Sequence, residues 1–240
     1  MVFVISTRIK GFKLYQSFLD DRVHDVKGYD RALFYFCDSS NDGTFKMKKT
    51  PVIFIDITKS EDELYNDFKD NTKRAIKDSA KMDIKVTFND GISGYDEFIS
   101  MFNNFIKTKG LKLPVMTADI LDQNRHMLAE VRHNGKLLVA HYYLLKKDFA
   151  LFIFACSERS RENNKVVGAA SRAIHWETMK YLKRSGFKTL SLASVEAFDE
   201  RTQGITDYKM SFGGYVKEIE YYQKDYSPML KLLEYWKSPK

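Results

Sequence analysis

The second half of the chain has the clearest pattern of apolar and polar positions. Two apolar, β-prone segments, residues 127–132 and 137–145, lie on either side of Asn134-Gly135. Asn-Gly between two such segments is the strongest short-range signal for a β-hairpin, because both residues adopt the positive φ angles of a tight turn. A third β-prone segment, residues 149–156, follows. The pattern predicts three consecutive antiparallel strands.

Helical periodicity then alternates with strand patterns to the end of the chain. Residues 168–184 are predicted to form a long helix that Gly186 terminates. Residues 188–193 are apolar enough to form a strand inside a sheet. The remaining predicted elements are a short helix at about 200–211, a strand at 215–222 and a terminal helix that begins at Ser227-Pro228.

The first half carries fewer clear signals. Ser60 and Glu63 form a capping-box pattern, and helical spacing continues to about Lys81, which predicts one helix. Apolar runs predict strands at 1–5, 32–37, 51–57 and 84–88. The strand at 51–57 is predicted to pair with the strand at 32–37. A turn cluster at 39–43 and a helix from about Phe98 to Gly110 complete the pattern.

Composition limits the kind of protein. The 240 residues are 44% hydrophobic and 30% charged, which is enough apolar content for a sizeable core. Cys37 and Cys156 belong to no metal-binding pattern and the histidines show no ligand spacing, so no metal site is expected. The N-terminus lacks a secretory signal and no apolar run reaches the roughly 20 residues that span a bilayer, which predicts a cytoplasmic protein. The net charge of +7 is compatible with an anionic ligand.

The order of elements predicts an α/β (α+β) fold with a mixed central sheet flanked by helices. No repeat or low-complexity linker interrupts the chain, so residues 1–240 are expected to form a single domain. Its expected parts are N-terminal strands at 1–57, a helical part at 58–124, a core half at 125–226 and a terminal helix at 227–240.

Three segments resemble the FemAB/FemX family of peptidoglycan-bridge enzymes. Residues 71–81 are similar to its Lys/Arg helix, 173–186 to its Leu-x-Trp helix with a final glycine, and 204–215, GITDYKMSFGGY, to its aromatic-Lys-x-x-Phe-Gly-Gly signature. The element order after residue 125 resembles the second half of the GNAT acyltransferase fold. The resemblance implies a GNAT-like fold and acyl transfer. FemX-like enzymes have two GNAT domains and use aminoacyl-tRNA, whereas this chain has room for one complete GNAT unit.

Residues 165–170, Lys-Val-Val-Gly-Ala-Ala, resemble the pyrophosphate loop of acetyl-CoA-dependent GNAT enzymes. A helix N-terminus offers unpaired N–H groups and about half a positive charge, and small residues let a phosphate approach it. The expected binding residues for acetyl-CoA, as a co-substrate, are Arg161, Lys165, Val167, Gly168, Ala169 and Ala170. Alternatively, the small residues serve only the close packing of a helix on a sheet.

Acyl transfer to an amine requires a neutral amine, donors for the developing oxyanion and a proton for the leaving thiolate. By the GNAT resemblance, Tyr208 is the candidate that protonates the thiolate, and Lys209 the candidate that contacts a phosphate or the acyl carbonyl. Core packing for Tyr208 and solvation for Lys209 are the alternatives. For the general base, His141 and Glu158 are the leading candidates and Glu130 the third, and no single one emerges.

Together, these resemblances imply an N-acyltransferase, most specifically an acetyl-CoA-dependent N-acetyltransferase. The acceptor that the family resemblance implies is the amine of a cell-envelope precursor such as a nucleotide-linked amino sugar. Lys73, Arg74 and Lys77 are candidates for binding an anionic acceptor, unless they form only a solvated helix face. Two alternatives stay open: an aminoacyl-tRNA-dependent aminoacyltransferase, which binds nucleic acid, and a non-catalytic GNAT-like binding module.

Overall fold

The computed structural model describes residues 3–38, 43–82, 84–89, 95–111, 113–121, 125–194 and 203–237. The chain forms two compact units. The single domain expected over residues 1–240 stays a prediction. The first unit comprises Met1–Thr50, Gly110–Asn124 and Glu218–Lys240, and the second Pro51–Lys109 and Arg125–Lys217. Of the predicted elements, most of the turn cluster at 39–43 and the start of the helix at 200–211 lie outside the described residues.

The first unit is built on a sheet formed by the N-terminal strands and one C-terminal strand. β1 (Phe3–Ile9) pairs antiparallel with β2 (Phe12–Phe18), which pairs in parallel with β3 (Arg31–Tyr35). β3 also pairs antiparallel with residues 221–225 of β10 (Tyr215–Asp225). The predicted pairing of 51–57 with 32–37 is therefore wrong. The unit also contains the helices α4 (Ala118–Leu121) and α7 (Pro228–Lys237).

The second unit contains the larger part of the sheet. In the described residues its strand order is β4, β9, β8, β7, β6, β5. All neighbours are antiparallel except β8 and β9, which are parallel. The strands are β4 (Lys46–Asp56), which begins in the first unit, β9 (Thr189–Ser194), β8 (Phe149–Ser157), β7 (Lys136–Lys146), β6 (His126–His133) and β5 (Lys85–Asn89).

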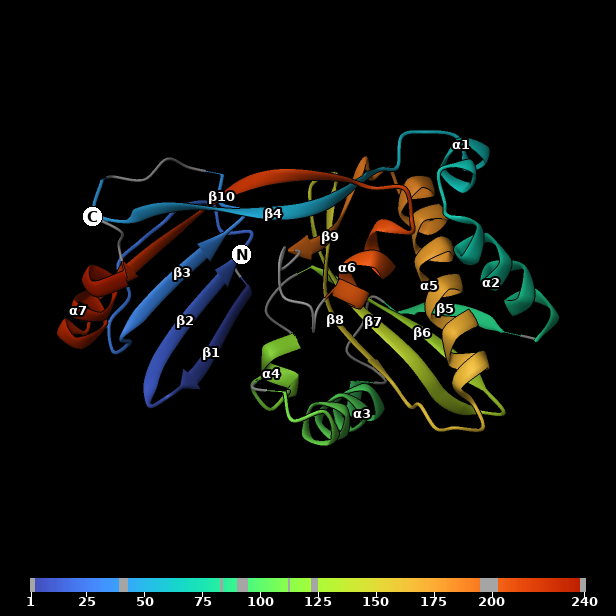
Figure 1. Cartoon of the computed structure of the whole chain (residues 1–240), viewed down its shortest axis with the longest axis horizontal. Helices are drawn as coiled ribbons and strands as arrows, with labels where there is room; N and C mark the ends of the chain where they lie inside the picture. The colour runs from blue at the N-terminus through green and yellow to red at the C-terminus, as the bar shows by residue number, and fades with distance from the viewer. Residues whose placement is uncertain are drawn as a thin grey trace. The chain divides into compact units, whose positions relative to one another are not determined.

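Helices cover both faces of this sheet (Figure 1). Tyr142 and Tyr143 are consecutive in β7 and therefore point to opposite faces. The ring of Tyr142 stacks on Phe98 of α3 (Tyr95–Thr108), whereas the hydroxyl of Tyr143 contacts His175 of α5 (Asn164–Arg184). The α5 face is the main core of the second unit, and α2 (Asp70–Lys81) packs beside α5.

The turn and cap signals of the second half are confirmed. The hairpin of β6 and β7 turns at Asn134-Gly135, which have φ angles of 52° and 77°. Helix α5 ends with Gly186 at φ 85°, where the N–H of Gly186 donates to the carbonyl of Lys183 and the N–H of Phe187 to that of Leu182. These two bonds satisfy carbonyl groups at the end of the helix.

The single helix predicted from Ser60 to Lys81 is two helices. The capping box of Ser60 and Glu63 is present and starts α1 (Glu61–Asn66), which ends before α2 begins. Between them, the N–H of Lys69 donates to the carbonyl oxygen of Ser211, which follows α6 (Gln203–Met210). A hydrogen bond to a distant segment thus replaces the continuation of the helix, and helical spacing within the segment carries no sign of that partner.

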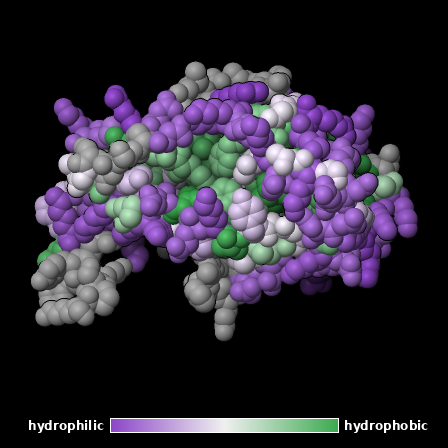
Figure 2. Space-filling view, turned by 90° about the horizontal axis from the view of Figure 1, so that it is seen from above, coloured by the Kyte–Doolittle hydropathy of each residue, from purple (hydrophilic) through white to green (hydrophobic). Residues whose placement is uncertain are grey.

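No helix of the described residues is long and apolar enough to cross a membrane. Hydrophilic residues cover most of the face shown in Figure 2, which agrees with the 30% of charged residues in the chain.

Candidate active site

The two parallel strands of the second unit separate toward their C-terminal ends. β8 and β9 pair over three positions, from Phe149 opposite Thr189 to Leu151 opposite Ser191. Beyond Leu151, the described residues provide β8 with a partner strand on one side only, which is β7. Among the residues that the structure describes, no strand pairs with the edge of residues 152–157 that faces away from β7. A strand edge of this kind can bind an extended ligand.

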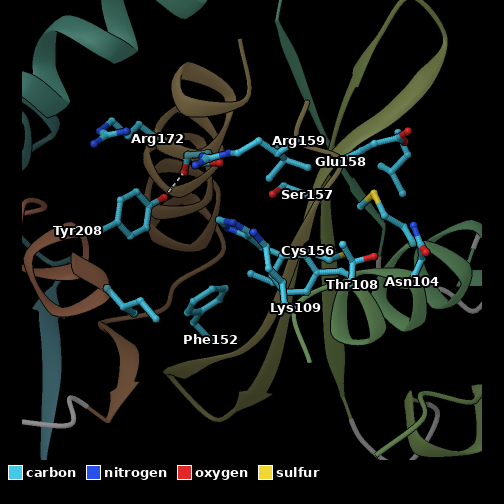
Figure 3. A pocket seen from close by; sticks show the side chains of 18 of the residues that line it. Asn104, Thr108, Lys109, Phe152, Cys156, Ser157, Glu158, Arg159, Arg172 and Tyr208 are labelled. Atoms are coloured by element: carbon cyan, nitrogen blue, oxygen red, sulfur yellow. Dashed lines mark hydrogen bonds between the residues drawn. The ribbon is translucent and has the colours of Figure 1, made fainter. Parts of the chain in front are cut away.

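A pocket of about 940 Å³ lies at this opening, entirely within the second unit. Its wall is formed by residues of β7, β8, α3, α5 and α6. Figure 3 shows Arg172 and Tyr208 on one side of the pocket and Asn104 and Thr108 on the other. Phe152, Ala155, Cys156 and Ser157 belong to the part of β8 that pairs with β7 but not with β9, so the pocket runs along this strand edge.

His141 contributes a neutral polar group to the pocket. Its Nδ1 is 3.3 Å from the hydroxyl oxygen of Tyr143, which is also 3.3 Å from Nδ1 of His175. Burial lowers the pKa of His141 to about 3 and also lowers the pKa of His175, because the charged imidazolium is poorly solvated there. Burial raises the pKa of Tyr143 for the same reason. A histidine with so low a pKa is a weak general base at neutral pH.

Tyr208 projects from α6 and is tied to α5. Its hydroxyl donates to the carbonyl oxygen of Ser171 at 2.5 Å, and its ring lies 5.3 Å from the guanidinium carbon of Arg172. Burial raises the pKa of Tyr208, and the positive charges of Arg172 and Arg159 oppose this rise only in part. The phenol therefore stays protonated and acts as a hydrogen-bond donor. Transfer of its proton to a thiolate is less favourable than for a tyrosine of unperturbed pKa.

Cations outnumber carboxylates around the pocket. Arg159, Arg172, Lys109 and Lys209 line it, together with Glu97 and Glu158. The charge of Glu97 is already balanced, because one of its carboxylate oxygens lies 2.6 Å from Arg132. That pair lowers the pKa of Glu97. The pocket is therefore suited to a ligand with negative charge.

Arg172 is the most unusual of these cations. One guanidinium nitrogen donates to the carbonyl oxygen of Gly168 at 3.1 Å, in its own helix, while its Nε is buried without a hydrogen-bond partner. No carboxylate of the described residues pairs with it. An unpaired N–H of a half-buried guanidinium costs free energy, which an anionic ligand in the pocket would recover.

Comparisons with known proteins bear on the fold. No protein-family model matches the sequence, and no curated protein matches it. Among solved structures, FemX superimposes with a TM-score of 0.62 at 12% identity, over 76% of this chain and 63% of its own. The C-terminal domain assigned to a putative lysylphosphatidylglycerol synthetase of Agrobacterium fabrum gives a TM-score of 0.60 at 13% identity, over 97% of this chain and 84% of its own. A structure named L-PGS, from Bacillus licheniformis, gives a TM-score of 0.57 at 10% identity, over 96% of this chain and 82% of its own.

The chain has a FemX-like fold. The fold class predicted from the sequence is thus confirmed, with a mixed sheet flanked by helices. The chain spans 63% of the length of the FemX structure. Identities of 10% to 13% show a shared FemX-like fold and not a shared substrate.

The four catalytic candidates from the sequence all line the pocket of the second unit. They are Tyr208, Lys209, His141 and Glu158. Lys209 is half-buried and donates from Nζ to the carbonyl oxygen of Ser194 at 2.9 Å. Glu130, the third candidate base, does not line the pocket, and burial raises its pKa.

The six residues expected to bind acetyl-CoA do not form a loop. Helix α5 begins at Asn164 rather than Gly168, so Lys165 to Ala170 lie in its first turns. Val167, Ala169 and Ala170 are buried in the core, while Lys165 and Arg161 are exposed near the helix start. No side chain caps this N-terminus and its first turn has no acidic residue. If α5 binds a phosphate, the binding groups are the N–H groups of its first turn, which precede Gly168.

Gly168→Ala tests this correction. A Cβ on Gly168 would have nothing within 4 Å, and the residue lies inside a helix. We expect the free energy of unfolding to rise by about 0.5–1 kcal/mol, because alanine has the higher helix propensity. Urea denaturation measures this change. A loss of stability would show that Gly168 is not in an open helical position.

The cations of α2 lie elsewhere. Lys73, Arg74 and Lys77 do not line the pocket, and Nζ of Lys73 donates to the carbonyl oxygen of Asn66 at 2.8 Å. Arg74 and Lys77 are exposed. Among the described residues there is also no group of three metal-binding side chains.

Sequence reasoning missed the contribution of α3 to the pocket. This helix presents a polar stripe at spacings of three and four residues, beside the apolar face that packs on the sheet. The stripe consists of Glu97, Ser100, Asn104 and Thr108. Small polar residues at such regular positions were the available signal, but they do not by themselves show which cavity they line.

Proposed function

We propose that the protein is an acyltransferase whose acyl donor lies along the open edge of β8. The separation of β8 from β9 next to a 940 Å³ pocket is the observation that carries this proposal. A strand edge without a partner offers N–H and C=O groups to any extended chain that contains amides. The pocket beside it gives the acyl group and the acceptor a place to meet, away from most of the solvent.

Acetyl-CoA is the donor we propose first. Its pantetheine arm is an extended chain with two amide groups, which suits the strand edge. Its pyrophosphate suits the uncapped first turn of α5, with Arg161 and Lys165 exposed nearby. Arg159, which lines the pocket next to this turn, supplies further positive charge.

The acceptor we propose is an amine on an anionic precursor of the cell envelope, such as a nucleotide-linked amino sugar. Its negative charge is complementary to Arg172, Lys209 and Lys109, which replace the α2 cations as the expected binding residues. In the reaction, the amine nitrogen bonds to the thioester carbon, the carbon–sulfur bond breaks and the sulfur leaves as thiolate. The amine gives up one proton, for which exposed Glu158 is the candidate base.

An aminoacyl-tRNA donor is the second candidate, and the structural likeness favours it. FemX and the domain assigned to a lysylphosphatidylglycerol synthetase are among the similar structures, and the name of the latter states that its product is lysylphosphatidylglycerol. An aminoacyl group is also an acyl group, and it suits the same opening between β8 and β9. In this case, the partner of the basic groups is the phosphate backbone of a nucleic acid.

Ligand binding and product formation distinguish the two donors. The melting temperature is measured with acetyl-CoA and with aminoacyl-tRNA, because a ligand that binds only the folded state raises it by mass action. The protein is then incubated with the stabilising donor and a panel of nucleotide-linked amino sugars, and mass spectrometry detects acylated product. Stabilisation by acetyl-CoA and an acetylated sugar support the first candidate. Stabilisation by neither donor would leave only a non-catalytic module and would contradict the proposal.

The triple variant Lys73→Gln, Arg74→Gln, Lys77→Gln tests the role of α2. These side chains do not line the pocket, so we expect kcat and KM to stay within about twofold of wild type at low salt, where exposed charges act most strongly. Steady-state kinetics at two salt concentrations measure this. A salt-sensitive rise in KM for the acceptor would restore these residues as binding groups.

A further inference from the structure

Three polar rings touch one another beneath the pocket, between β7 and α5. Oη of Tyr143 is 3.3 Å from Nδ1 of His141 and 3.3 Å from Nδ1 of His175, and the imidazole centroids are 4.4 Å apart. His141 lines the pocket, whereas Tyr143 and His175 are fully buried. These rings connect the pocket with the interior of the second unit.

The hydroxyl of Tyr143 has one proton to donate and lone pairs that accept hydrogen bonds. It donates to Nδ1 of one histidine at most, and if it accepted from Nδ1–H of both, its own buried proton would need a third partner. Burial keeps both imidazoles neutral, as their lowered pKa values indicate. Thr178 lies near the same hydroxyl, but its buried Oγ1 has no hydrogen-bond partner. The two histidines therefore have opposite tautomers.

Nε2 of His175 decides which histidine has which tautomer. This atom is buried and has no hydrogen-bond partner. A proton on it would leave a buried N–H without an acceptor, and such donors are rarer in proteins than unpaired acceptors. The ring centroids of His175 and Phe212 are 4.8 Å apart, so Phe212 offers only a weak N–H···π contact. His175 therefore carries its proton on Nδ1, Tyr143 donates to His141, and His141 carries its proton on Nε2.

We propose that His175 is a positioning residue that, through Tyr143, holds His141 as an Nε2–H donor for the acyl oxygen in the pocket. Nε2 of His141 has no hydrogen-bond partner among the described residues, and the His141 side chain lines the pocket. When the amine adds to the acyl carbon, the carbonyl oxygen gains negative charge, which this N–H stabilises. When the leaving group departs, the charge returns to the C=O bond and the proton stays on Nε2. This role at the acyl oxygen rests on the proposed acyl transfer, whereas the tautomers do not.

Nitrogen NMR tests the tautomers without any substrate. Protein labelled with ¹⁵N-histidine is measured at neutral pH by long-range ¹H–¹⁵N correlation, which distinguishes the two neutral forms. His141→Gln and His175→Asn variants assign the signals. We expect His175 protonated on Nδ1 and His141 on Nε2. The reverse order, the same tautomer in both, or a cationic imidazole at pH 7 would overturn the proposal.

Kinetics test the consequence. His141→Leu removes the donor and is expected to lower kcat about 100-fold or more, whereas His141→Gln, which retains an N–H group, loses less. His175→Leu removes the group that orders the rings and is expected to lower kcat at least about tenfold with little change in KM. His175→Asn keeps a donor near the position of Nδ1 and should recover part of this loss. Equal kcat values for folded His175→Leu and His175→Asn would contradict the positioning role. If acyl transfer itself is absent, the NMR result still stands or falls independently.

Discussion

Gly213→Ala is expected to lower the free energy of unfolding by about 3 kcal/mol. Gly213 follows α6 with φ 73°, and a Cβ there would lie 2.4 Å from Cβ and 2.7 Å from the carbonyl oxygen of Asp67. The left-handed backbone costs a non-glycine residue about 1–2 kcal/mol, and overpacking costs about 1–3 kcal/mol more. The clashing atoms belong to the backbone and to a Cβ, so no side-chain rotation relieves them. Urea denaturation measures the change.

Two other glycines separate these contributions. Gly186 has φ 85° but nothing within 4 Å of its Cβ position, so Gly186→Ala is expected to cost only the backbone share, about 1–2 kcal/mol. Gly204, in α6, has neither a positive φ angle nor an atom within 4 Å of its Cβ position. Gly204→Ala should therefore not lower the free energy of unfolding. If Gly213→Ala costs no more than Gly186→Ala, the close approach to Asp67 is not present in solution.

Arg172→Leu is expected to raise KM for the anionic substrate about 10- to 100-fold, because a hydrogen bond to a charged group contributes about 1.5–3 kcal/mol. The stability of the free protein should change by less than about 1 kcal/mol, since the lost cation–π contact with Tyr208 is offset by removal of an unpaired buried N–H. Steady-state kinetics and urea denaturation of the same preparation measure both quantities.

Arg184→Leu is the matched control. Arg184 lies in the same helix at its C-terminal end, exposed, with Glu61 at 3.5 Å, and it does not line the pocket. Its substitution should leave KM unchanged, because an exposed ion pair contributes little and acts locally. Equal KM values for the two variants would show that Arg172 does not bind substrate. A large loss of stability in Arg172→Leu alone would indicate a structural role.

The stretch GITDYKMSFGGY illustrates how far sequence patterns reach. Its two glycines mark a tight helix end, and Tyr208 and Lys209 line the pocket. The reason for each glycine lies in other segments. Gly213 passes the backbone of Asp67, and a Cβ on Gly214 would lie 2.7 Å from Ile53 and 2.8 Å from the carbonyl oxygen of Phe54. The residues of the stretch itself do not indicate either contact.

The sequence by itself determined the features that depend on neighbouring residues. The Asn134-Gly135 hairpin, the Ser60–Glu63 capping box and the glycine end of α5 follow from backbone preferences and short-range hydrogen bonds. The order of elements after residue 125, and with it the fold class, rests on the same local signals.

Only the tertiary structure decided what depends on distant partners. The predicted helix is interrupted at Lys69, whose N–H bonds to Ser211. Helix α5 begins at Asn164, and the pairing of β8 with β9 ends after Leu151. The tertiary structure also brought α3, β7 and α6 to one pocket and paired Tyr143 with two histidines from different elements. These features arise from packing and hydrogen bonds between segments far apart in the chain, which periodicity within a single segment does not encode.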